Sequence, residues 1–269
     1  IGALTNAQVA ALSTAQVAGL ATDDFNALTT AQFAALTSGQ TAAITATQMD
    51  VIGTDDLAAI STAALRALTT DALAALDSTQ IPAFTNAQVA ALTTRQIASL
   101  DAADLGALST AQMAALTSAQ VAAFTTAQFD AIATDDLAAI NATALRSLAT
   151  ANIAVLDTAQ FSALTTAQLG AFTATQAGAI TSAQTDVLAT DRLAAMSTAA
   201  IRALTTEALA AFDSAQIGAL TNTQVAALST TQLSSLATDD FNALTTAQFA
   251  ALTSAQTASI TATQMDAIG

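Results

Sequence analysis

The apolar positions of this chain recur with a period of eight residues. A large apolar residue (Leu, Ile, Phe or Met) occupies every eighth position from Leu4 to Ile268. Five positions after most of them stands a second large apolar residue, as at Val9 and Val17. Residues 28–35, LTTAQFAA, show this octad in its cleanest form. We expect both apolar series to point inward. We call the second apolar position of each octad the Val9 series. The position directly after it should face solvent, because it accepts Asn26, Asp50, Arg66, Pro82 and Gly106.

Each octad carries the residues that start a helix. Thr29 is of the type preferred at an N-cap, where its hydroxyl accepts from a backbone N–H of the first turn. Gln32, three residues later, can reach back to the N–H of the cap and complete a capping box. Leu28 and Phe33 stand at the two positions of a hydrophobic staple. The octad therefore predicts one short helix, about a turn and a half long.

Some octads lack part of this start signal. In five octads the cap position holds Ala instead of a polar residue or Gly: Ala21, Ala133, Ala149, Ala189 and Ala237. A Thr follows each of these Ala, so the cap could lie one residue later. Ala also replaces the Gln in five octads, at Ala64, Ala72, Ala144, Ala200 and Ala208.

Two other folds fit the pattern less well. In one continuous helix, eight residues advance by roughly 800°, so the apolar series would drift by about 80° per octad and form no stripe. In a β-solenoid, Val9 and Leu12, three residues apart, would lie on opposite faces of a strand. The octads also lack the regular Gly or Asn of tight turns. The sequence predicts an all-α solenoid.

A longer repeat is superimposed on the octad. Residues 1–53 return as residues 217–269 with eight differences, an offset of 216 residues or 27 octads. We expect 1–269 to form a single repeat array, in which 1–216 is one super-repeat and 217–269 begins the next. We also expect the array to belong to a longer parent chain, with flanking repeats of that chain as neighbours.

Recurring segments inside the super-repeat suggest the size of a superhelical turn. The sequence TDDLAAI at 54–60 returns at 134–140, and TDRLAAM follows at 190–196, so the offsets are 80 and 56 residues, or 10 and 7 octads. An octad with Arg follows each segment, at Arg66, Arg146 and Arg202. Whole turns of about 3.4 octads, or about 27 residues, fit these offsets. Paired antiparallel helices, with two octads per coil, do not fit the offset of seven octads, because seven is not a whole number of such coils.

Composition excludes several classes of function. The net charge is −15, with five Arg and no Lys, which argues against binding to nucleic acid or to anionic lipid. His and Cys are absent, so nucleophilic catalysis lacks its usual groups, and we expect no enzyme and no cofactor. Polar residues interrupt every octad, so no membrane-spanning stretch of roughly 18 apolar residues is present.

Four pairs of adjacent aspartates are the candidates for a metal site. Hard cations such as Ca²⁺ bind to carboxylate and other oxygens. The alternative is that both aspartates lie in the first helical turn, where the helix dipole favours anions and the second Asp replaces Gln in the capping box. No EF-hand loop pattern favours calcium. The pairs are Asp23 and Asp24, Asp55 and Asp56, Asp135 and Asp136, and Asp239 and Asp240.

The repeated Leu-Thr-x-x-Gln string, as at 28–32, resembles two kinds of protein. It is similar to the LTxxQ motif of a family of periplasmic bacterial stress chaperones, where the motif is sparse and lies on longer helices. The Ala/Thr-rich tandem octads resemble very large secreted or surface-attached bacterial repeat proteins. That second resemblance implies an extracellular or cell-surface location.

We therefore expect a structural role in a filament, stalk, sheath or adhesin shaft. The expected partner is the chain itself, through homopolymer or lateral association. The alternative is a solenoid that binds a peptide, a glycan or a surface. Binding to ice or mineral is less favoured, because the first Thr of each octad is used as a cap.

Overall fold

The structure is a computed structural model that describes residues 1–268, and within that range it contains only helices and their connections. Nearly every octad forms one α-helix of four to six residues, as the sequence predicts. The α-helices are numbered to α32 (Ala262–Ala267), and a single 3-10 helix, η1 (Ile81–Ala83), takes the place of one of them. The fold class is therefore the predicted all-α solenoid.

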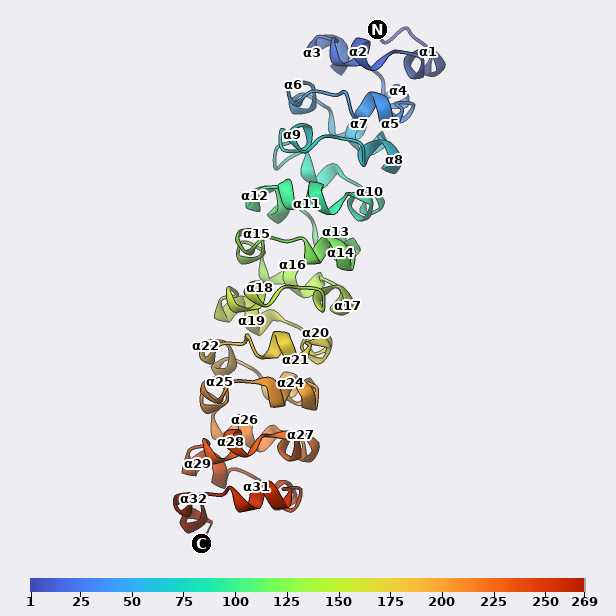
Figure 1. Ribbon diagram of the computed structural model, residues 1–269. Helices are drawn as coiled ribbons and strands as arrows, with labels where there is room; N and C mark the ends of the chain where they lie inside the picture. Colours follow the sequence, from blue (N-terminus) through green and yellow to red (C-terminus); the bar gives the residue numbers. More distant parts are fainter. Residues whose placement is uncertain (269) are drawn as a thin grey trace. The chain divides into compact units, whose positions relative to one another are not determined.

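The chain divides into two compact units, and Figure 1 traces the helices of each in chain order. The first unit, Ile1–Ile140, contains η1 and sixteen α-helices: α1 (Asn6–Ala10), α2 (Thr14–Ala18), α3 (Thr22–Asn26), α4 (Thr30–Ala34), α5 (Ser38–Thr41), α6 (Ala46–Asp50), α7 (Thr54–Ala59), α8 (Thr62–Leu65), α9 (Thr70–Leu73), α10 (Asn86–Ala91), α11 (Thr94–Ser99), α12 (Ala102–Gly106), α13 (Thr110–Ala115), α14 (Ser118–Ala122), α15 (Thr126–Asp130) and α16 (Thr134–Ala139).

The second unit begins at Asn141 and repeats the same element. Its helices are α17 (Ala142–Leu145), α18 (Thr150–Ala154), α19 (Thr158–Ala163), α20 (Thr166–Ala171), α21 (Ala174–Ala177), α22 (Ser182–Asp186), α23 (Thr190–Ala195), α24 (Thr198–Ala203), α25 (Thr206–Ala210), α26 (Ser214–Ala219), α27 (Asn222–Ala227), α28 (Thr230–Ser234), α29 (Thr238–Asn242), α30 (Thr246–Ala250), α31 (Ser254–Ala258) and α32. The prediction of a single array over 1–269 stays a prediction.

Two extended residues join one helix to the next. After α10, Leu92 has φ −53° and ψ 140°, and the following cap, Thr93, has φ −73° and ψ 157°. Among residues 1–268, no peptide bond is cis and no residue has a positive φ. The chain can therefore turn at every octad without glycine, which explains why the octads need no regular Gly.

The core of each unit consists of the two predicted apolar series. Val9 and Leu57 from one series are fully buried, and Leu28 and Leu164 from the other are at most 4% exposed. Thr185 replaces an apolar residue of the first series, is fully buried, and donates its hydroxyl to the Ala208 carbonyl at 2.8 Å. The predicted outward position is exposed at Asn26, Asp50, Arg66, Pro82 and Gly106.

Helices that lie three octads apart pack against each other on successive turns of the solenoid. In the first unit α4 contacts α7 and α10 contacts α13, and in the second α21 contacts α24. Side-chain hydrogen bonds from buried Gln residues reach 28 and 31 residues back along the chain. One turn therefore takes between three and four octads. This range contains the predicted value of about 3.4 octads and excludes a coil of two.

Two details differ from the prediction. The helices that follow Ala21 and Ala133 begin in the ordinary register, with the Ala as an extended N-cap that makes no side-chain hydrogen bond, so the cap is not displaced to the next Thr. The octad that contains Pro82 forms η1 instead of an α-helix. Proline has no N–H to donate to the carbonyl four residues earlier, which interrupts the α-helical ladder at this point.

Candidate functional site: glutamine braces, acidic pairs and an arginine pocket

The buried Gln residues of the octads have a second role that the sequence analysis missed. In the octad after Leu92, Gln96 Oε1 accepts from the Thr93 backbone N–H at 2.8 Å, which is the predicted capping-box bond. Gln96 Nε2 also donates to the Leu65 and Leu68 carbonyls of the preceding turn, at 2.9 and 3.0 Å. We call this pair of bonds from Nε2 the brace. The side chain is 2% exposed, so it links the turns inside the structure.

The brace recurs in both units. It joins Gln40 to the Val9 and Leu12 carbonyls at 2.7 and 2.9 Å, and Gln224 to the Leu193 and Met196 carbonyls at 3.0 and 2.8 Å. The brace gives the Leu65 carbonyl a second donor, since this carbonyl also accepts from the Leu68 N–H at 3.1 Å, and it gives the Leu68 carbonyl a donor from the next turn. No buried side-chain N or O atom within residues 1–268 lacks a hydrogen-bond partner.

The sequence carries little signal for the brace. A capping box accepts Glu as readily as Gln, since only the acceptor oxygen is used. However, this position holds Gln, Asp, Ala, Asn or Arg and never Glu. The chain contains a single Glu, Glu207, and Asp occupies this position in five octads, so the residue choice does not by itself reveal the brace.

The paired aspartates lie in the first turns of four separate helices, α3, α7, α16 and α29. Helix α7 packs against α4 and α3 against α6, so these contacts do not bring the first two pairs together. No group of three or more His, Cys, Asp or Glu side chains within residues 1–268 could hold a metal ion. Each pair therefore offers Ca²⁺ two adjacent carboxylates, whereas the ion takes six to eight oxygens.

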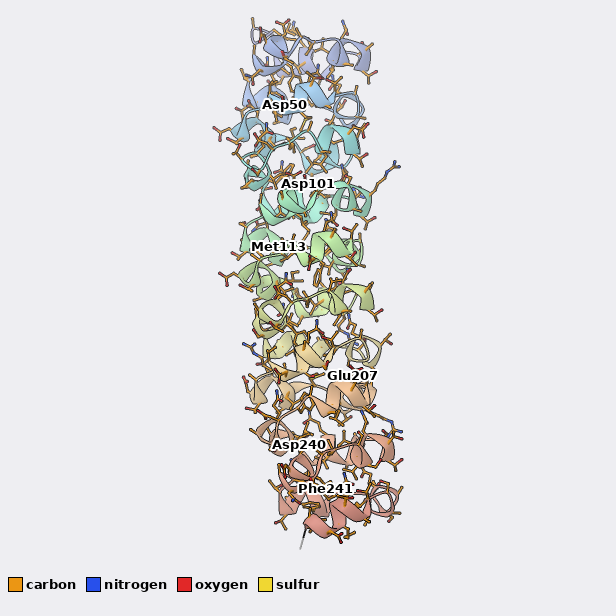
Figure 2. All side chains as sticks on the ribbon, turned by 90° about the vertical axis from the view of Figure 1, so that its left-hand side faces the viewer. Asp50, Asp101, Met113, Glu207, Asp240 and Phe241 are labelled. Atoms are coloured by element: carbon orange, nitrogen blue, oxygen red, sulfur yellow. The ribbon has the colours of Figure 1, made fainter. Side chains whose placement is uncertain are left out.

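The second aspartate of two pairs bonds to the preceding turn. Asp56 accepts from the Thr30 hydroxyl at 2.7 Å, and Asp240 accepts from the Ser214 hydroxyl at 2.9 Å. The helices that carry them have no side-chain cap bond, so the predicted replacement of Gln by Asp in a capping box is wrong. The Asp side chain is shorter than that of Gln by one methylene group, so it does not reach back to the cap as Gln does. Figure 2 labels Asp240 beside Phe241, which is fully buried in the core.

Two carboxyl groups have raised pKa values. Burial raises the pKa of Asp104, and the negative charges of Asp101 and Asp77 raise it further. Burial also raises the pKa of Asp136, with a contribution from Asp135. The opposite holds at Asp77, whose pKa is lowered by hydrogen bonds from the Thr79 hydroxyl and from the backbone N–H groups of Thr79 and Gln80.

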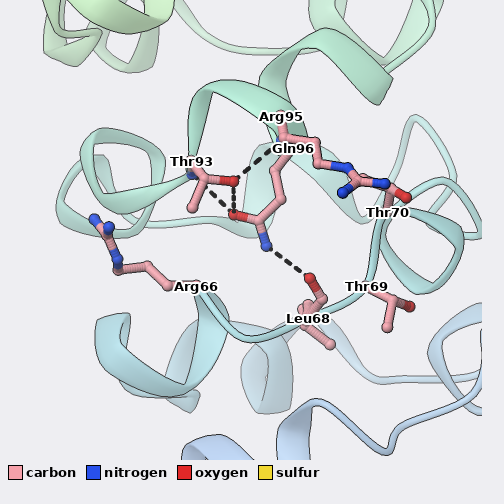
Figure 3. A pocket seen from close by; sticks show the side chains of 7 residues that line it. All are labelled: Arg66, Leu68, Thr69, Thr70, Thr93, Arg95 and Gln96. Atoms are coloured by element: carbon pink, nitrogen blue, oxygen red, sulfur yellow. Dashed lines mark hydrogen bonds between the residues drawn. The ribbon is translucent and has the colours of Figure 1, made fainter.

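A surface pocket in the first unit is lined by two arginines. Its volume is about 290 Å³, and it is lined by Arg66, Leu68, Thr69, Thr70, Thr93, Arg95 and Gln96. Figure 3 shows Arg66 and Arg95 on opposite sides, with Gln96 and Leu68 between them. Neither the acidic pairs nor the capping motif had pointed to this pocket. Sequence analysis noted Arg66 as a marker of the super-repeat and as a residue of the exposed position, and did not connect it with Arg95.

These features define an all-α solenoid of octads in which capping boxes set most helices and glutamine braces tie successive turns. The chain belongs to the ALTTAQ repeat family, whose model matches residues 1–29, 17–51, 49–86, 97–131, 129–166 and 186–222. The predicted tandem-repeat character is thereby confirmed. No curated protein is similar enough to this chain to count as a relative.

Proposed function

We propose that this chain is a structural repeat protein that serves as a shaft, stalk or filament segment outside the cell or at its surface. The observation that carries the proposal is the recurrence of the brace. Each additional octad of the common type adds one capped helix, two buried apolar side chains and two hydrogen bonds to the preceding turn. A longer chain therefore extends the same structure, which suits a protein whose role depends on its length.

The proposed partner is a second copy of this chain. The charge of −15 opposes close approach of two copies at low ionic strength, and salt screens that repulsion. Among residues 1–268, no helix has the length and apolar content that crossing a membrane requires. The charge also argues against nucleic acid and anionic lipid as partners, and the proposal includes no enzymatic step.

Electron microscopy of the protein in vitreous ice tests this function, at dilute and concentrated protein and at low and high salt. We expect uniform filaments whose abundance rises with protein concentration and with salt. Isolated particles under every condition would overturn self-association and leave a spacer role. A chain with Gln96, Gln120 and Gln224 changed to Glu is the matched control, since it loses three braces. Filaments that persist in this control would show that the solenoid does not build them.

A further inference from the structure

The arginine pocket stands out against the charge of the chain. Arg66 and Arg95 are the only basic side chains between residues 1 and 140, and both line this pocket. Arg66 directly follows α8, and Arg95 lies in the first turn of α11. Helix α11 packs against α9, and the residues that open α9, Thr69 and Thr70, form the side of the pocket on the preceding turn. The fold therefore gathers these two cations from different turns.

Both arginines have donors left for a ligand. Arg66 Nη1 donates to the Ala91 carbonyl at 3.3 Å, which holds the side chain across the turn and leaves its other N–H groups available. The Arg95 side chain is exposed and makes no hydrogen bond or ion pair with any residue in the range 1–268. A guanidinium that faces solvent without an intramolecular partner is suited to binding a carboxylate.

The remaining polar lining is mostly hydroxyl groups. The Thr70 hydroxyl has no hydrogen-bond partner within residues 1–268, and the Thr69 hydroxyl accepts from the Ala72 N–H at 3.1 Å while its proton stays available. Thr93 and Gln96 bond to each other and are already satisfied. Leu68 is the only large apolar residue of the lining, and it is 4% exposed. The free polar groups of the pocket are therefore cations and hydroxyls, set in a surface that is otherwise largely apolar.

A second pocket continues from the first. It has a volume of about 340 Å³ and shares Arg66 and Thr93, and its other lining residues are Ala90, Leu92, Thr94, Thr117, Ala119 and Gln120. A ligand longer than one ring can therefore run from one pocket into the next, past Arg66. The hydroxyl groups of Thr94 and Thr117 extend the polar lining along this path.

We propose that these adjoining pockets bind a saccharide chain that carries an isolated uronic-acid carboxylate among neutral sugars. The carboxylate bonds to Arg95 or Arg66, and the sugar hydroxyls bond to Thr69 and Thr70. The net charge of −15 repels a polymer that is charged at every unit, which favours a sparsely charged chain. A peptide bound by strand addition would need an open strand edge, and residues 1–268 form no strand. The proposal does not depend on the structural role proposed above.

The second unit contains an internal comparison for this pocket. A shift of 136 residues places Arg202, Thr205, Thr206, Ser229 and Gln232 at the positions of Arg66, Thr69, Thr70, Thr93 and Gln96. Arg202 Nη1 donates to the Ala227 carbonyl at 3.3 Å, as Arg66 does to Ala91. Thr231 stands where Arg95 stands in the first unit. The two surfaces therefore differ in charge at one position.

Isothermal titration calorimetry on the full chain tests the proposal. The probe is a xylo-oligosaccharide with a single glucuronic acid branch, and its control is the same oligosaccharide with that carboxyl reduced to an alcohol. We expect one bound acidic oligosaccharide per chain and no measurable binding of the reduced one. R95T should lower the affinity by about tenfold or more, because it removes a charge-assisted hydrogen bond. T231R should create a second site.

The controls separate a specific site from a charge effect. R192T removes one positive charge outside the pocket and should leave the affinity unchanged. R95T places at residue 95 the residue found at Thr231, so it should fold, and circular dichroism checks this. Equal binding of the reduced oligosaccharide, or an R95T chain that binds as the parent does, would overturn the proposal. Equally tight binding of an acidic peptide with one carboxylate would overturn the choice of a saccharide.

Discussion

The Gln96 side chain has a single amide group and four hydrogen-bond partners. Its oxygen accepts from the N–H and the hydroxyl of Thr93, and its NH₂ group donates to the carbonyls of Leu65 and Leu68. One side chain thereby fixes the start of its own helix and the position of the preceding turn. Glutamate could keep the first role and would lose the second, because a carboxylate has no proton to donate.

This difference predicts an order of stability at residue 96. Q96A should lower the free energy of unfolding by about 1–3 kcal/mol, because two buried carbonyls lose a donor. Q96E should cost more than Q96A, since it also places a buried negative charge against two carbonyl oxygens. Urea unfolding measures both. Q16E is the matched control: Gln16 makes the capping bonds at the exposed first turn and makes no brace within residues 1–268. An equal loss in Q16E and Q96E would contradict the role of the brace.

Asp104 occupies the Gln position and predicts a pH dependence. Its pKa in the folded protein is raised above the ordinary value of 3.8, so the folded state binds protons more readily than the unfolded state. This group therefore favours folding most at a pH below 3.8, and the contribution is lost as pH rises through the higher folded pKa. At pH 7 the buried charge is a cost, and D104N should be more stable than the parent.

Thermal melting of D104N and the parent across a range of pH checks this. The advantage of D104N should be present at neutral pH and should shrink as the pH falls through the folded pKa of Asp104. D71N, which alters an exposed aspartate of helix α9, controls for the general effect of removing one charge. An advantage of D104N that stays constant with pH would contradict the assignment of the effect to this carboxyl.

At the scale of the element, each helix is too short to be stable alone. Helices of four to six residues lie below the length at which an isolated helix persists in water. The cap decides where the helix starts, and the buried Leu and Val9-series residues decide which side faces the core. Octads without a polar cap keep the same start because packing and the extended backbone at that position remain, as at Ala237 with φ −60° and ψ 156°.

A missing cap can therefore be added without a change of register. A237S should raise the free energy of unfolding by about 1 kcal/mol, because the new hydroxyl can accept from the Asp240 N–H of the first turn. Removal of an existing cap in the same unit, S229A, should have the opposite sign, since the Ser229 hydroxyl accepts from the Gln232 N–H at 3.1 Å. Chemical unfolding of both variants gives the comparison. Loss of stability in A237S would show that the backbone there does not suit a cap.

At the scale of the whole molecule, stability depends on contacts between turns. A brace links residues 28 and 31 positions apart, so no segment shorter than one full turn can form it. In repeat proteins of this kind, folding of one repeat favours folding of its neighbours. The array should therefore gain stability with each added turn.

Fragments of the first unit test this dependence. A peptide of residues 85–108, three octads, should show no helical circular dichroism, although it contains two complete capping boxes and a third capped helix start. A fragment of residues 53–140 contains several braced turns and should be helical and unfold cooperatively. The three-octad peptide with scrambled sequence serves as the unfolded reference. Helical structure in the short peptide would mean that local capping is sufficient.

The sequence by itself determined the element and its period. The cap at Thr29, the reach of Gln32 and the spacing of Leu28 and Phe33 are local relations within one octad, so they could be read without knowledge of distant contacts. The size of the turn also followed, because recurrence of the TDDLAAI segment reports which octads occupy equivalent positions. Both buried series and the exposed position were predicted correctly, because the pattern of apolar and polar residues within the octad marks them.

The tertiary structure alone decided what crosses between turns. The donation from Gln96 to Leu65 and Leu68 and the bond from Thr30 to Asp56 join residues 26 to 31 positions apart. The pocket lined by both Arg66 and Arg95 likewise depends on residues 29 positions apart. Such partners depend on the rotation per octad, which is fixed by packing of the whole turn and not by any local preference. The interactions within an octad can therefore be predicted from the sequence, whereas the interactions between turns form only when the solenoid folds.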